Sequence, residues 1–176
     1  MHGDREWIQV ITGCALLGLV CLFPCGTATA ARVQLPAGTE VKVKFDPLVT
    51  INSGRSVAGV PLQVHLAEAI TVSGRVVVEE GAVGTATIME VVQAGRGGKP
   101  GKISVSFVEL QTKGLFKAPD DALIKLAGSE TRAGKGKKLL SYLFIAGLFI
   151  KGGQAEIPTD QVYMATIAET IILESE

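Results

Sequence analysis

Alternation of apolar and polar residues with a period of two is the feature that most constrains the fold of this chain. Val41, Val43 and Phe45 alternate with lysines, and a second apolar alternation runs through residues 60–66. Successive side chains of a β-strand point to opposite faces, so each run predicts a strand with one buried face. Further runs with strand character occupy residues 70–72, 75–78, 88–92, 103–107 and 170–172.

Turn-forming residues separate several of these runs. Ser73 and Gly74 lie between two short β-branched segments, and residues 112–114 separate 108–110 from 115–116. Both arrangements predict antiparallel hairpins. We therefore expect an all-β fold, a small antiparallel β-barrel or sandwich, whose one helical element is a short helix near residues 138–149.

A turn motif recurs three times, at residues 35–39, 78–82 and 157–161. In each copy an apolar residue precedes a tight turn and a new strand. Gly38 and Gly81 supply the positive φ that a type II turn needs, and Asp160 occupies the equivalent position of the third copy. The alternative is that the motif is the turn chemistry common to any β-protein.

The N-terminal segment has the pattern of a secretory signal. Residues 7–23 are almost wholly apolar, and the small residues Ala28 and Ala30 precede Ala31 in the order that a signal peptidase requires. We expect residues 1–30 to be a signal peptide, with an uncleaved membrane anchor as the alternative. Residues 31–176 then form a single β-rich domain, with no cysteine because all 3 cysteines precede Ala31.

The charge balance argues against a nucleic-acid partner. The chain holds 17 Lys plus Arg and 17 Asp plus Glu; removing Arg5, Asp4 and Glu6 with the N-terminal segment leaves 16 against 15. A balance this near neutrality creates no strong field of either sign.

No combination of residues predicts catalysis, a metal site or a cofactor. His65 is the single histidine after residue 30, and strand alternation places it on the outer face without a nucleophile or carboxylate pair beside it. Zinc requires about four clustered ligands, which are absent. The glycine-rich segment 95–102 departs from a phosphate-binding loop at Arg96 and at Ile103, so it predicts a hairpin loop.

Two segments are candidate contact surfaces. The first is the basic hairpin with Arg96, Lys99 and Lys102, which suits an anionic surface such as lipid head groups or glycan phosphates. The second is the apolar run 139–150, which has lysines before and after it and is too short to span a bilayer as a helix. This run is a core element, a membrane-dipping loop or a subunit interface; its representative residues are Leu139, Leu140, Phe144 and Phe149.

Residues 35–114 contain in order LPAGT, a strand, an S-G turn, a second strand, the segment GAVG at 81–84 and GxxGKPGxxxVxF. This pattern resembles exported β-domains of bacterial envelope proteins and is more distantly similar to the C-terminal β-barrel of the TrbI-like conjugal-transfer family. The resemblance implies a barrel-like domain in the cell envelope. Unlike the TrbI-like proteins, this chain lacks a long proline-rich linker.

We therefore expect a non-enzymatic protein of the periplasm or cell envelope that acts as a structural or assembly component. The expected partners are other envelope proteins or further copies of the chain, with membrane-surface contact as a further possibility. The alternatives are a soluble periplasmic ligand-binding module and a hydrolase that uses two of the glutamates.

Overall fold

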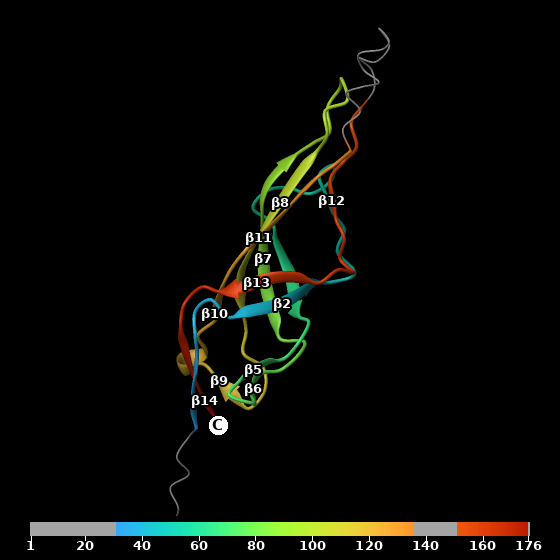
Figure 1. Cartoon of the computed structure of the whole chain (residues 1–176). Coiled ribbons are helices and arrows are strands. Elements are labelled where there is room, and N and C mark those ends of the chain that lie inside the picture. Colours follow the sequence, from blue (N-terminus) through green and yellow to red (C-terminus); the bar gives the residue numbers. More distant parts are fainter. Residues whose placement is uncertain (1–30, 136–150, 176) are drawn as a thin grey trace, which may run out of the picture.

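The computed structural model describes residues 31–135 and 151–175, which form fourteen strands and one 3-10 turn (Figure 1). The elements in chain order are β1 (Arg32–Leu35), β2 (Glu40–Phe45), β3 (Ile51–Asn52), β4 (Pro61–Leu66), β5 (Ile70–Val72), β6 (Arg75–Val78), β7 (Val83–Val92), β8 (Lys102–Leu110), β9 (Phe116–Lys117), η1 (Pro119–Asp121), β10 (Ile124–Ala127), β11 (Ser129–Ala133), β12 (Glu156–Ile157), β13 (Tyr163–Ile167) and β14 (Ile171–Ser175). The predicted helix near 138–149 lies outside the described residues.

Six of these strands close into an antiparallel β-barrel. Their order is β10, β13, β2, β4, β7 and β8, and β10 then pairs with β8 to complete the circle. β10 makes the two pairings through different residues. Leu126 lies opposite Ile167 of β13, and Ile124 lies opposite Leu110 of β8. The all-β prediction is confirmed, and of its two architectures the structure has the barrel.

The period-two alternation places the apolar residues inside the barrel. Val41, Val43 and Phe45 are buried, while the lysines between them face outward. Phe45 packs edge-on against Tyr163 with ring centroids 5.2 Å apart and stacks on Phe107 at 5.9 Å. Side chains therefore fill this barrel, as expected for a small one, and the interior is a hydrophobic core.

Two copies of the predicted turn motif form type II turns. The Thr39 N–H donates to the Pro36 carbonyl, and the Ala82 N–H donates to the Glu79 carbonyl. The third residue of each turn is a glycine with positive φ, 81° at Gly38 and 75° at its counterpart. These turns lead β1 into β2 and β6 into β7.

The prediction for the third copy is wrong. Asp160 does not have the left-handed backbone that a type II turn requires at that position. The carbonyl that would begin the turn, that of Pro158, instead accepts the Tyr163 hydroxyl. A hydrogen bond from a side chain therefore holds this segment, and the backbone turn is not formed.

Of the two predicted hairpins, one is confirmed. β5 and β6 pair across Ser73 and Gly74, whose φ values of 51° and 77° match the two-residue turn typical of hairpins. The prediction of a hairpin across residues 112–114 is wrong, because β9 pairs with β14 instead of β8. The end of β8 has no free edge, since Leu110 already lies between β7 and β10.

Beyond the closed part of the barrel, β7 and β8 continue as a ribbon toward one end of the molecule (Figure 1). A β-bulge at Met89 interrupts their register between Ile88 and Glu90 and leaves the Met89 side chain exposed. β11 follows β8 along this ribbon, with Ala133 opposite Lys102. The opposite end of the molecule carries β5, β6, β9 and β14.

Candidate functional site

The loop between β7 and β8 carries the predicted basic contact residues. Arg96 and Lys99 are exposed in this loop, and neither forms an ion pair within the described residues. Lys102 begins β8, and its Nζ lies 2.6 Å from the Glu90 carboxylate of β7. Arg96 and Lys99 are therefore the unneutralised cations of the predicted set, whereas Lys102 is paired.

The apolar members of the predicted surface, Leu139, Leu140, Phe144 and Phe149, lie outside the described residues. The chain on either side of them is described, at residues 133–135 and 151–155. Both of these segments return to the β7–β8 loop, so the structure brings the basic hairpin beside the described residues on either side of the gap (Figure 1).

Backbone hydrogen bonds connect these segments in series. The Gly134 N–H donates to the Gly101 carbonyl at 2.8 Å, and the Gly101 N–H donates to the Gly153 carbonyl at 2.9 Å. The Gly153 N–H donates to Lys135, and the Gly152 N–H donates to Gly95. Backbone hydrogen bonds between glycine residues thus join the segments at this end of the molecule.

A buried serine joins a fourth segment to the other three. The Ser53 hydroxyl lies 2.7 Å from the Gln154 side-chain oxygen and accepts the Ala155 N–H at 2.9 Å. The same Gln154 oxygen accepts the Ala94 N–H of the β7–β8 loop. Ser53 is fully buried, and in the described part of the chain it is the one buried residue with a polar side chain besides Tyr163 of the barrel. We refer to residues 52–56, 93–101, 133–135 and 151–155 together as the tip junction.

Gly101 and Gly134 are among the glycines of the tip junction that leave no room for a side chain. A Cβ atom at Gly101 would collide with the Ser53 hydroxyl and approach the Val92 carbonyl to 3.0 Å. A Cβ at Gly134 would collide with the Gly153 carbonyl. Backbone segments approach this closely only where glycine is present, so these residues set the geometry of the junction.

The tip junction is cationic. It contains no Asp or Glu, and its five basic residues are all exposed. None of the five forms an ion pair with any acidic residue of segments 31–135 and 151–175. We refer to these residues as the tip cations: Arg55, Arg96, Lys99, Lys135 and Lys151.

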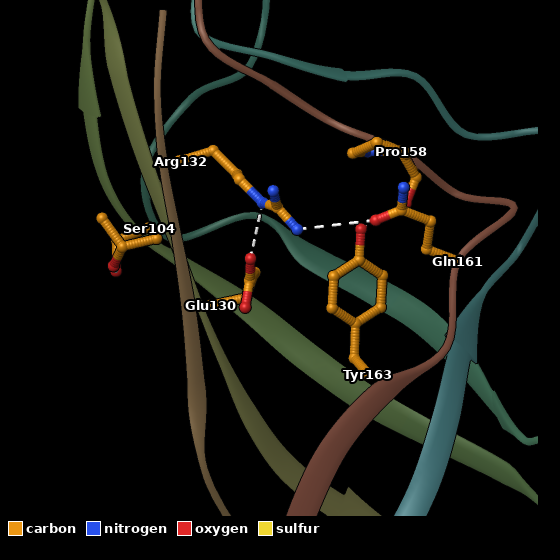
Figure 2. Close-up of polar contacts among 7 residues, drawn as sticks. Ser104, Glu130, Arg132, Pro158, Gln161 and Tyr163 are labelled. Carbon is orange, nitrogen blue, oxygen red and sulfur yellow. Dashed lines mark hydrogen bonds and ion pairs between the residues drawn. The ribbon is translucent and has the colours of Figure 1, made fainter.

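A polar cluster connects the tip junction to the barrel (Figure 2). On β11, Arg132 forms an ion pair with Glu130 at 2.6 Å and points toward Gln161, whose side-chain oxygen is 3.5 Å away. Tyr163 of β13 donates its hydroxyl to the Pro158 carbonyl at 2.5 Å. Burial of the phenol raises the pKa of Tyr163, while the nearby Arg132 opposes this rise. The cluster ties β11, which leads into the junction, to the chain returning from it.

The remaining predicted features take ordinary positions. His65 lies half-buried on the outer face of β4, beside the exposed Gln63. Within the described ranges, no cluster of three His, Cys, Asp or Glu residues could ligate a metal ion. The same ranges contain no helix with the length and apolar character needed to cross a bilayer.

A surface hollow of about 440 Å³ lies at the other end of the molecule, between β1 and the β5–β6 turn. Its lining includes Arg32, Gln34 and Arg75, which are exposed, and no buried polar side chain points into it. A specific ligand site is typically built from buried, convergent polar groups, and this hollow lacks them.

Comparisons with known protein families, with curated proteins and with solved structures found no match for this chain. The candidate site therefore depends on the chain's own geometry.

Sequence reasoning did not predict that Arg55, Ser53 and Gln154 belong to this end of the molecule. Their segments are distant from the β7–β8 loop in sequence, and hydrogen bonds to backbone leave no repeating pattern. One available signal was the position of Gly134, Gly152 and Gly153 on either side of the apolar run, because paired glycines permit two chains to approach closely.

Proposed function

We propose that this protein is an exported, non-enzymatic component of the cell envelope that acts as a structural or assembly module through its tip. The observation that carries the proposal is the set of five exposed tip cations on a junction with no acidic residue. Elsewhere in the described chain, cations such as Lys42, Lys125 and Arg132 have carboxylate partners within 3.0 Å. Unpaired cations contribute little to folding, so their concentration at one end suits contact with another molecule.

The way the tip is held supports the same proposal. The barrel core stabilises the fold, whereas the tip junction adds a hydrogen-bonded platform that presents the β7–β8 loop together with residues 133–135 and 151–155. Binding elements are commonly carried on loops that a rigid scaffold positions. The apolar sequence of residues 139–150 would add a hydrophobic contact beside the cations.

The sequence resemblance supports the location. Residues 35–114 resemble exported β-domains of bacterial envelope proteins and, more distantly, TrbI-like barrels, and residues 1–30 have the signal pattern. On this proposal the partners are other envelope proteins or further copies of the chain.

The test is the native mass of a C-terminally tagged protein in two fractions, an envelope extract in mild detergent and the soluble periplasm. We expect a large assembly in the detergent extract that the double variant Arg96→Gln, Lys99→Gln weakens. The matched control Lys44→Gln, Arg75→Gln removes two exposed, unpaired cations outside the junction and is expected to keep the assembly. A soluble species near monomer mass would contradict the proposal and favour a ligand-binding module.

A further inference from the structure

The tip cations form a surface whose charge is not balanced by the protein itself. Lys99 and Lys151 are brought together because the Gly152 N–H donates to Gly95 and the Gly95 N–H donates to Lys99. Lys135 joins them through its carbonyl, which accepts the Gly153 N–H. Like charges gathered in this way repel one another, so their proximity favours an anionic partner that neutralises them.

We propose that the tip junction docks on the surface of an anionic phospholipid bilayer, with the tip cations against the phosphate head groups. This inference rests on the proposed function and specifies one partner of the same tip. Each lysine or arginine held near an anionic membrane raises the partition constant by about five-fold, so five cations together raise it by about 3,000-fold, which corresponds to reversible surface binding.

A lipid surface fits the tip better than a nucleic acid does. The four segments of the tip junction contain no aromatic side chain on which bases could stack. The glycines around Arg96 also leave the head groups unobstructed access to the charge.

The geometry also sets the orientation of docking. The tip lies at one end of the elongated molecule, and the C-terminus lies at the other (Figure 1). A protein docked through its tip would project from the membrane surface, and β9 and β14 would not contact the bilayer. The charge-balanced regions, where Lys42 pairs with Glu68 and Lys125 with Glu169, would not contact lipid.

The experiment measures partitioning of the purified product of the full-length gene onto vesicles. One vesicle preparation is phosphatidylcholine alone, and the other contains added phosphatidylglycerol. The ratio of the two partition constants isolates the electrostatic contribution, because any apolar contact of the chain contributes to both. We expect strong preference for the anionic vesicles, and loss of that preference at an ionic strength of about 1 M, where the Debye length falls to about 3 Å.

The matched variants test the position of the binding surface. Arg96→Gln with Lys99→Gln is expected to lower the partition constant on anionic vesicles by about 25-fold, whereas Lys44→Gln with Arg75→Gln lowers it much less. Far-ultraviolet circular dichroism checks that both variants keep the fold.

Equal effects of the two pairs, or no preference for anionic vesicles, would overturn the proposal, as would binding to duplex DNA as tight as binding to the vesicles. The vesicle assay contains no protein partner, and the native-mass test contains no bilayer. An assembly that persists while vesicle binding is absent would therefore reject lipid docking and leave the proposed function in place.

Discussion

The barrel and the tip junction are stabilised by different interactions. In the barrel, alternating apolar side chains from six strands fill a closed core around Phe45, Phe107 and Tyr163. In the tip junction, hydrogen bonds among glycine backbones and the Ser53 hydroxyl hold four segments together. Because the two regions depend on different residues, substitutions can perturb the candidate contact surface while the fold is retained.

The largest expected effect is on the barrel core. Phe107→Ala would remove a buried ring that packs against both other aromatic residues of the barrel and is expected to lower the free energy of unfolding by about 3–5 kcal/mol. The control Met164→Ala changes an exposed side chain of β13 and should cost less than about 0.5 kcal/mol. Urea unfolding followed by circular dichroism measures both values. Equal values would show that the core does not dominate stability.

A smaller effect is expected from Gly101→Ala, which acts on the tip junction. The added Cβ would collide with the Ser53 hydroxyl, and we expect a cost of about 1–3 kcal/mol. Gly95→Ala is the matched control in the same loop, because its Cβ would meet Lys99 at an ordinary 3.4 Å. A tolerated Gly101→Ala would contradict the close packing of the junction.

Ser53→Ala tests the hydrogen bonds of the junction without adding atoms. It would leave the Ala155 N–H and the Gln154 side-chain oxygen without their common partner, at a cost of about 1–2 kcal/mol. The effect should be local, so hydrogen exchange at Ala155 should accelerate while exchange at the barrel residue Val43 is unchanged. Ser104→Ala, which loses an exposed hydroxyl contact on β8, is the control. Equal acceleration in the barrel would contradict the independence of the two regions.

The smallest effect concerns Tyr163, which connects the two regions. Burial raises the pKa of Tyr163 above its usual 10.0, so the folded state holds the phenol proton more tightly than the unfolded state. The protonated phenol therefore contributes its full stabilisation of the folded state below pH 10, the pKa of the unfolded state. This contribution is lost as the pH rises through the pKa of the folded state. Tyr163→Phe should cost about 1 kcal/mol at neutral pH and lose less stability above pH 10 than the parent protein. Parallel stability curves across this pH range would contradict the assignment.

The sequence was a good guide to the barrel and a poor guide to the tip. Alternation in β2, β4 and β8 predicted the strands because one buried face imposes a period of two on the residues. The pairing of β9 with β14 could not be predicted, since a two-residue strand such as Phe116–Lys117 carries no period and its partner is distant in sequence.

For the candidate site, the sequence indicated the cations but not how they are brought together. Arg96 and Lys99 were recognisable as an unusual basic loop. The involvement of Arg55 and Gln154 was not, because hydrogen bonds to backbone groups impose no pattern on the side chains. Asp160 shows the opposite error, in which a familiar turn pattern was overridden by the hydrogen bond from Tyr163 to Pro158.

The most direct test of the central claim, that the tip is the contact surface, is site-specific photocross-linking in intact cells that produce the protein. A photoreactive amino acid is placed at Lys99 in the tip or at Leu115, which is 74% exposed at the other end. We predict protein or lipid adducts from position 99 and few from position 115. Adducts from position 115 alone, or equal adducts from both, would contradict the account.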